Sequence, residues 1–190
     1  MKPHVRVLGV DDSPFSFDDS RSLVVGALVR TPSYLEALMK TEVTVDGTDG
    51  TDGLVEMISS SRYREQIKVI MLDGVALAGF NVIDIVAVHE SLKLPVLTIT
   101  RDPPDFEAIR SALRKHFDDW RERFALVKKL PLREMPTSDK PILAAGIGLE
   151  WREFQELVKS STVRGVIPEP IRMAHLVSAA MAKGESRGRS

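Results

Sequence analysis

Two of the most apolar stretches of this sequence end in aspartate. Residues Val69 to Leu72 lead into Asp73, and His4 to Val10 lead into Asp11 and Asp12. Each stretch predicts a short strand that delivers a carboxylate to the turn at its end. If the two strands lie side by side, Asp11 and Asp73 are suited to hold one divalent cation between them. Because Asp is also a favoured turn residue, either position alone is equally consistent with a purely structural role.

The segments around these aspartates predict an α/β fold with a mixed sheet. Residues Arg21 to Arg30 and Glu42 to Val45 are expected to form strands that pair with the first strand as an antiparallel meander. The Asp73 strand, a helix through Lys93 and a strand from Leu94 to Arg101 predict a parallel βαβ unit. Open sheets of this class place their ligands at the carboxyl ends of the strands. The chemistry is therefore expected at the edge where Asp73 lies.

The rest of the chain supplies helices and one more strand. Helices are expected over Leu54 to Ser60, from Phe106 to about Lys128, over Glu150 to Lys159 and after Pro168, a strand over Ile142 to Ala145, and irregular chain over Pro131 to Pro141. The long charged helix from Phe106 is interpreted as a solvated flank without a function. With 190 residues, a single domain over residues 1–183 is expected, followed by a flexible basic tail over 184–190.

A near-repeat of Asp-Gly-Thr over residues 46–53 offers a third carboxylate. Its simplest interpretation is a turn before a helix, with an aspartate as the N-cap. The alternative is that Asp49 joins Asp11 and Asp73 as a metal ligand, with Asp46 and Glu56 as substitutes. A calcium-binding loop is excluded, because the bidentate glutamate is not at the required position.

Composition excludes several classes of protein. Cysteine is absent, which excludes disulfides, thiol catalysis and cysteine-bound zinc. No apolar run reaches the roughly 18 to 20 residues that span a membrane, and no signal-peptide pattern is present, so we expect a cytoplasmic protein without a membrane partner. Residues 1–100 hold 9 Lys and Arg against 14 Asp and Glu, and residues 101–190 hold 17 against 13. This asymmetry is compatible with nucleic acid as the partner, although solvated helix faces produce similar patterns and no strongly basic domain is present.

Three motifs resemble those of endonuclease V, in the same order along the chain. Gly9-Val10-Asp11-Asp12-Ser13 resembles its first-strand motif, and Asp73-Gly74 followed by Leu94-Pro95-Val96 resembles its second. Ile167 to His175 resembles its C-terminal Pro-Glu-Pro-x-Arg signature and is the most specific match. More narrowly, the chain is similar to the archaeal relatives of endonuclease V that are also called endonuclease dU. The resemblance covers most of the chain and implies a ribonuclease H-like fold, with three antiparallel strands plus parallel strands flanked by helices.

The resemblance also implies a metal site. Carboxylates hold the metal ions of ribonuclease H-like nucleases, so Asp11, Asp49 and Asp73 are the expected ligands of Mg²⁺, with Mn²⁺ as a substitute and no small-molecule cofactor. Two such ions about 4 Å apart bind the attacking water and the leaving oxygen together. His175 resembles the late histidine of some endonuclease V sequences, where it orients water, moves a proton or ligates an ion. The alternative is an ordinary helix histidine that is hydrogen-bonded to its neighbours.

Three further residues are candidates for contacts with a substrate. Arg101 follows a parallel strand at the same edge as the two aspartates and is suited to neutralise a phosphate, or else it pairs with a neighbouring aspartate. Arg172 lies within the C-terminal signature and is a candidate backbone contact or a structural anchor. Tyr34 is a candidate for the wall of a pocket that takes one flipped base, together with Phe80 and the stretch Ala76 to Gly79.

These features lead to a metal-dependent endonuclease of DNA repair that cuts near a deaminated base, with deoxyuridine favoured over deoxyinosine. Departures from endonuclease V keep alternatives open. Gly79-Phe80-Asn81 stands where that enzyme carries His-Pro-Arg, and Asp46 and Asp49 stand where its aromatic wedge ends in a glutamate. One alternative is an RNA-directed nuclease of the same fold. The other is a non-catalytic protein with a degraded site that binds nucleic acid or a partner.

Overall fold

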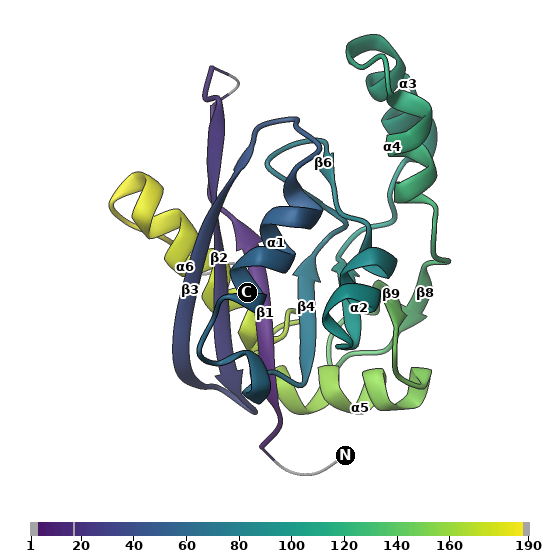
Figure 1. Ribbon diagram of the computed structural model, residues 1–190. Helices are drawn as coiled ribbons and strands as arrows, with labels where there is room; N and C mark the ends of the chain where they lie inside the picture. The colour runs from purple at the N-terminus through teal and green to yellow at the C-terminus, as the bar shows by residue number, and fades with distance from the viewer. Residues whose placement is uncertain (1–3, 17, 188–190) are drawn as a thin grey trace.

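The computed structural model describes residues 4–16 and 18–187, and its centre is a seven-stranded mixed sheet (Figure 1). In the order β3-β2-β1-β4-β7-β9-β8, its strands are β3 (Tyr34–Thr44), β2 (Arg21–Arg30), β1 (Arg6–Asp12), β4 (Val69–Asp73), β7 (Val96–Thr100), β9 (Ile142–Ile147) and β8 (Arg133–Met135). The first three strands form an antiparallel meander, and β4 and β7 lie parallel to β1. β9 returns antiparallel to β7 and carries β8 on its outer edge. The predicted mixed sheet is confirmed.

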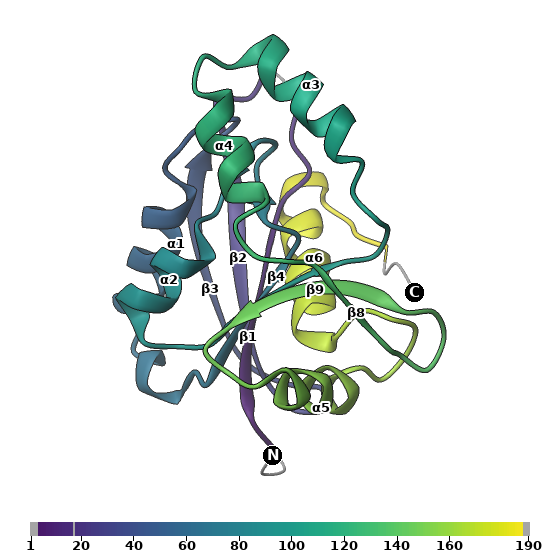
Figure 2. The ribbon, with the colours of Figure 1, turned by 90° about the vertical axis from the view of Figure 1, so that its right-hand side faces the viewer.

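Helices cover both faces of this sheet. They are α1 (Gly50–Ser59), α2 (Ile85–Leu92), α3 (Phe106–His116), α4 (Trp120–Val127), α5 (Trp151–Ser161) and α6 (Glu169–Lys183). α1 and α2 pack on one face, and α5 and α6 pack on the other, so that the sheet forms the middle layer (Figure 2). α3 and α4 form a hairpin that projects beyond the sheet (Figure 1). A two-stranded ribbon, β5 (Ala76–Leu77) with β6 (Asn81–Val82), follows β4.

Alternating side chains of the central strands divide the core into two layers. One cluster holds Leu8, Val10, Ile70 and Leu72 with residues of α1 and α2, and the other holds Val7, Val69 and Met71 with residues of α5 and α6. Because both faces of β1 and β4 are buried, these strands are apolar at almost every position, as is typical of strands between two helical layers. This apolar pattern stops at the carboxyl end of each strand, at Asp11 in β1 and at Asp73 in β4.

The long helix expected from Phe106 to about Lys128 is instead two helices. The chain leaves α3 at Phe117, whose backbone is extended with φ −135° and ψ 132°. The Phe117 ring lies 5.7 Å from the ring of Phe80, and the guanidinium of Arg123 stacks 4.3 Å from its centroid. These tertiary contacts override the helical pattern, since helix propensity is a weak preference.

Smaller differences occur at the edges of the sheet. β3 begins at Tyr34, well before the expected start at Glu42, and β8 lies in the segment Pro131 to Pro141, which was expected to be irregular. Both are edge strands that depend on pairing with a neighbour rather than on their own apolar pattern. Residues 188–190 of the predicted tail lie outside the described residues, so the tail and the single domain stay predictions. Over the part of the chain that the structure describes, no helix has the length and apolar character that a membrane crossing requires.

Candidate active site

Asp11 and Asp73 end two neighbouring parallel strands. Val10 of β1 pairs with Leu72 of β4, so the next position in the same register sets Asp11 beside Asp73. Because side chains alternate along a strand, both carboxylates belong to the face that α5 and α6 cover. Neighbouring strands lie about 4.8 Å apart, which brings the two carboxylates within reach of one cation. Asp11 is almost fully buried, with 6% of its surface exposed.

α6 reaches this face because Gly9 allows its backbone to approach β1. A Cβ atom at Gly9 would lie 2.0 Å from the carbonyl carbon of Pro170. Pro168 caps the helix and Pro170 stands in its first turn, where a missing N–H costs nothing. Arg172 Nε donates to both carboxylate oxygens of the buried Glu169 at 3.0 Å. The C-terminal signature is therefore the joint between α6 and β1.

This joint sets His175 of α6 against Asp11. Nδ1 of the imidazole lies 2.8 Å from Oδ2 of Asp11. In the tautomer with the proton on Nδ1, the ring donates to the carboxylate, and Nε2 is the basic nitrogen. Asp11, Asp73 and His175, which the sequence singled out, therefore come together at one edge of the sheet. Their predicted roles in metal binding and catalysis stay predictions.

Asp12 belongs to the opposite face of β1. Its Oδ2 accepts a hydrogen bond from the backbone N–H of Ala78 at 3.0 Å, and its own carbonyl accepts one from the Ser178 hydroxyl at 3.0 Å. Burial, and then the neighbouring carboxylate of Asp11, raise the pKa of Asp12 to about 6, with a smaller contribution from Asp73. The carboxylates of Asp11, Asp12 and Asp73 therefore repel one another at this edge of the sheet.

The third predicted metal ligand, Asp49, is engaged elsewhere. Its carboxylate accepts hydrogen bonds from the N–H of Thr44 at 3.1 Å, the hydroxyl of Thr44 at 2.9 Å and Nδ2 of Asn81 at 2.7 Å. Burial opposes ionisation, but these hydrogen bonds outweigh it and lower the pKa of Asp49. Across residues 4–16 and 18–187, no three His, Cys, Asp or Glu side chains gather closely enough to enclose a metal ion. The three-carboxylate arrangement with Asp11 and Asp73 is therefore not found.

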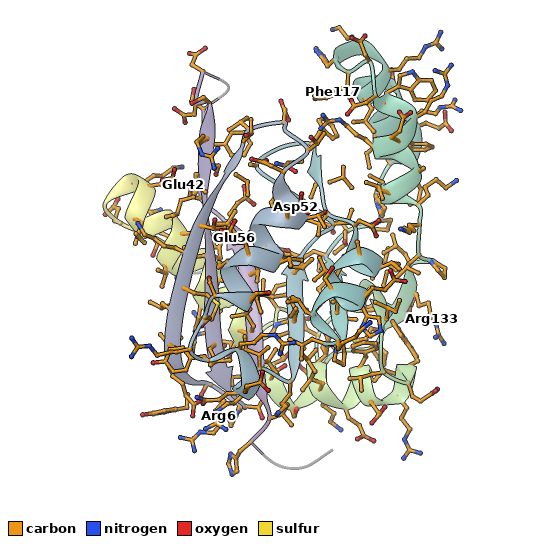
Figure 3. The ribbon with its side chains drawn as sticks, in the orientation of Figure 1. Arg6, Glu42, Asp52, Glu56, Phe117 and Arg133 are labelled. Atoms are coloured by element: carbon orange, nitrogen blue, oxygen red, sulfur yellow. The ribbon has the colours of Figure 1, made fainter. Side chains whose placement is uncertain are left out.

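The two substitutes for Asp49 have other surroundings. Oδ1 of Asp46 accepts a hydrogen bond from the N–H of Phe80 at 2.7 Å, which ties the β3–α1 turn to the β5–β6 ribbon. Glu56 is an exposed residue of α1 (Figure 3). Neither is brought to the pair of carboxylates at the ends of β1 and β4. Asp49 and Asp46 instead organise a turn, because the Asp-Gly repeat places their carboxylates against backbone N–H groups.

The three predicted substrate contacts have different outcomes. Arg101 follows β7 at the carboxyl edge of the sheet. The neighbouring aspartates have other partners, because Asp102 pairs with Lys140 at 3.4 Å and Asp105 caps α3. The guanidinium of Arg172 is paired with Glu169, so the structure favours the anchor over the substrate contact. Tyr34 pairs with Arg30, which lies opposite the start of β1, at the other end of the sheet. Tyr34 is therefore not brought together with Phe80 and the stretch Ala76 to Gly79, and its predicted contact with a base stays a prediction.

An apolar pocket of about 270 Å³ lies where Gly74 continues the chain beyond Asp73. Phe80, Ala76 and Gly79 line it, as the sequence predicted for a base pocket. Its opposite wall was missed, because Phe106, Ile109 and Leu126 come from the α3–α4 hairpin, which was interpreted as a solvated flank. Ile109 and Leu113, three and seven positions after Phe106, form an apolar stripe that indicates a helix with one packed face.

The comparisons with known proteins agree with this geometry. A profile of the endonuclease dU family matches residues 3–182. A UPF0215 protein of Methanothermobacter thermautotrophicus is 39% identical over 189 residues, which cover 99% of this chain and 93% of that protein. A crystal structure from Archaeoglobus fulgidus, of a protein of unknown function, is 39% identical, covers 93% of this chain and 98% of that chain, and superposes with a TM-score of 0.83.

Endonuclease V has the same fold at a lower level of similarity. The Ciona intestinalis enzyme, in complex with a DNA that contains an inosine followed by a ribo-adenosine, is 16% identical. The match covers 90% of this chain and 83% of that chain, with a TM-score of 0.57. The ribonuclease H-like fold and the resemblance to the archaeal relatives of endonuclease V are both confirmed.

Proposed function

The chain belongs to the endonuclease dU family, and from that premise we propose that it is a metal-dependent endonuclease that cuts DNA beside a deaminated base, deoxyuridine in preference to deoxyinosine. One observation carries the proposal. Asp11 and Asp73 end adjacent parallel strands on the same face of the sheet, and His175 contacts Asp11 at 2.8 Å. This combination of two carboxylates and one base suits the hydrolysis of a phosphodiester.

The donor atoms fit a hard divalent cation. Mg²⁺ prefers oxygen ligands, and it is commonly held by one or two carboxylates, with waters and substrate phosphates completing its coordination. Asp11 and Asp73 would hold it, and a third carboxylate from the protein is not required. The raised pKa of Asp12 supports this assignment, because the carboxylate of Asp11 contributes to it and a cation would relieve that repulsion. When bound, the ion would polarise the phosphate and lower the pKa of a bound water.

His175 supplies the proton chemistry in this proposal. Its hydrogen bond to Asp11 orients the ring and stabilises the imidazolium that forms when Nε2 takes a proton. The close approach of the start of α6 to Gly9, where a Cβ would meet the backbone of Pro170, places the helix that carries His175 against β1. Arg101 lies past the end of β7 and is the candidate contact for the scissile phosphate.

The apolar pocket supports recognition of a single base. Enzymes that act next to one base take it out of the helical stack into a fitted pocket. The pocket begins at Gly74, directly after Asp73, so it lies at the same edge of the sheet as the carboxylates, on the face that α2 covers. Its volume of about 270 Å³ is at the small end of ligand sites and suits one base better than a larger ligand. Thr98, Thr100 and Lys129 provide polar groups in a mainly apolar lining.

Cutting assays test this proposal. Purified protein is incubated with Mg²⁺ or Mn²⁺ and labelled duplexes that hold one deoxyuridine, one deoxyinosine or no lesion, with matched RNA strands beside them. We expect cutting that needs the metal, prefers deoxyuridine and is lost in Asp73→Asn. Preference for the RNA strands would replace DNA by RNA as the substrate. Absence of cutting on every strand by folded protein would refute the nuclease and favour a binding role.

A further inference from the structure

The α3–α4 hairpin is attached to the rest of the molecule by an arginine. Each of its helices has a single buried residue, which is Leu113 in α3 and Arg123 in α4. The hairpin extends past the carboxyl edge of the sheet, and Phe117 marks its bend (Figure 3). A helix pair that buries so little of its own surface depends on specific contacts for its position.

The guanidinium of Arg123 forms hydrogen bonds with four residues, although the sequence analysis predicts no role for Arg123. Its Nη1 donates to the backbone carbonyls of Asp46, Gly47 and Phe80 at 2.9, 2.8 and 2.7 Å. Its Nε donates to Oδ1 of Asp119 at 2.8 Å, and only 7% of Arg123 is exposed. One guanidinium therefore joins α4 to the β3–α1 turn and to the β5–β6 ribbon.

These contacts lie directly behind the pocket. Phe80, whose carbonyl accepts from Arg123, lines the pocket, and its ring packs edge-on against Phe117. The hairpin supplies the facing wall through Phe106, Ile109 and Leu126. The width of the pocket is thus the distance between the sheet edge and a hairpin whose position Arg123 fixes.

We propose that Arg123 is a positioning residue that holds the α3–α4 hairpin over the pocket and thereby sets the selectivity for the base. This inference rests on the proposed function, because it assumes that the pocket receives a base. Without the guanidinium, three partly buried carbonyls lose this partner, and the planar fork that reaches them has no equivalent in another side chain. The hairpin would then shift, and the pocket would accept undamaged bases. The carboxylates at β1 and β4 would be unaffected, since Arg123 contacts neither.

The test compares Arg123→Met with Arg6→Met. Arg6 forms an ion pair with Glu36 at the opposite end of the molecule (Figure 3), so its replacement removes an arginine pair of similar type far from the pocket. For each protein, kcat and KM are measured on deoxyuridine and undamaged duplexes, and amide hydrogen exchange is followed over residues 106–127. For Arg123→Met we expect KM on the deoxyuridine duplex to rise about tenfold or more, as the loss of buried hydrogen bonds predicts.

The other measurements distinguish a loss of base selectivity from a general loss of activity or stability. In Arg123→Met, the preference for deoxyuridine over undamaged DNA falls, kcat changes less than KM, and exchange over residues 106–127 accelerates. Arg123→Lys recovers part of the preference, and Arg6→Met resembles the wild type. If Arg123→Met does not fold, Arg123→Lys alone carries the same test, because a single ammonium lacks the planar fork that reaches Asp119 and the carbonyls together.

Two results would overturn the inference. One is an unchanged preference in a folded Arg123 variant, while the wild type cuts deoxyuridine duplexes. The other is an equal loss of kcat on both duplexes with no change in preference, which would indicate a general structural role. A wild type that cuts no substrate refutes the proposed function itself, and the inference with it, so the two failures are distinguishable.

Discussion

Nδ1 of His175 lies 2.8 Å from Oδ2 of Asp11, although the two residues are 164 positions apart in the sequence. The contact joins the last helix to the first strand at the edge where chemistry is expected. It has the form of a base that is oriented by a carboxylate, and it gives the late histidine a specific partner rather than the general surroundings of a helix surface.

Replacement of His175 by alanine should therefore affect turnover more than binding. We expect kcat to fall by about 10²- to 10⁴-fold, the usual contribution of a general acid or base, with a smaller change in KM. His89→Ala is the matched control, because His89 also stands on a helix and its Nδ1 contacts only a backbone carbonyl, that of Leu94 at 2.7 Å. Equal losses in the two variants would contradict the catalytic role of His175.

Gly9→Ala should disturb the same contact from the other side. The added Cβ would meet backbone atoms of Pro170 and Ile171 at 2.0 and 2.4 Å, and backbone cannot move aside as a side chain can. We expect a loss of at least about 1 to 3 kcal/mol in the free energy of unfolding, measured by urea denaturation, together with reduced activity. Gly53→Ala is the control, because its Cβ would meet only a Val43 methyl at 3.2 Å, within a helix that favours alanine. Wild-type stability of Gly9→Ala would refute the close approach of α6.

The carboxylates at the ends of β1 and β4 were predictable because their signal is local. A strand that is buried on both faces leaves an apolar run in the sequence, and the first carboxylate after the run marks its end. Because β1 and β4 run parallel, the aspartates that follow their apolar runs lie at the same edge of the sheet. The same reasoning could not show which face each carboxylate occupies, so Asp12 was not distinguished as a residue of the opposite face until the register was known.

Residues with distant partners could not be placed in this way. Asp49 bonds with Asn81, which is 32 positions away, and Arg123 bonds with carbonyls that are 77 and 43 positions away. Tyr34 lies at the other end of the sheet because β2 runs antiparallel to β1 and ends opposite the start of β1, where the turn to β3 follows. The break at Phe117 depends on a ring from another segment. In each case the deciding contact is tertiary, and no periodicity in the sequence records it.

Divalent metal should stabilise the folded protein through Asp11 and Asp73. At Mg²⁺ or Mn²⁺ concentrations about 100 times the Kd, we expect a gain of about 2.7 kcal/mol, which corresponds to a rise of about 5 to 10 °C in Tm for a protein of this size. Asp73→Asn should abolish the gain in a calorimetric scan. Asp49→Asn should keep it, because that carboxylate is bound to Thr44 and Asn81. Loss of the gain in Asp49→Asn would instead support a site with three carboxylates.

Asp12 makes the stability of the protein depend on pH. Its pKa is raised to about 6 from 3.8 by burial and by the Asp11 carboxylate, so between these values the folded state binds more protons than the unfolded state. The contribution of Asp12 to the free energy of unfolding should therefore fall as the pH rises from about 4 to 6 and remain lower above this range, by up to about 3 kcal/mol. Asp12→Asn keeps an oxygen for the N–H of Ala78 but removes the charge. In metal-free buffer, we expect the variant to be more stable than the wild type by about 1 to 3 kcal/mol at pH 8 and equally stable at pH 3.5, as measured by urea denaturation. A gain of the same size at both pH values would show that charge is not its cause.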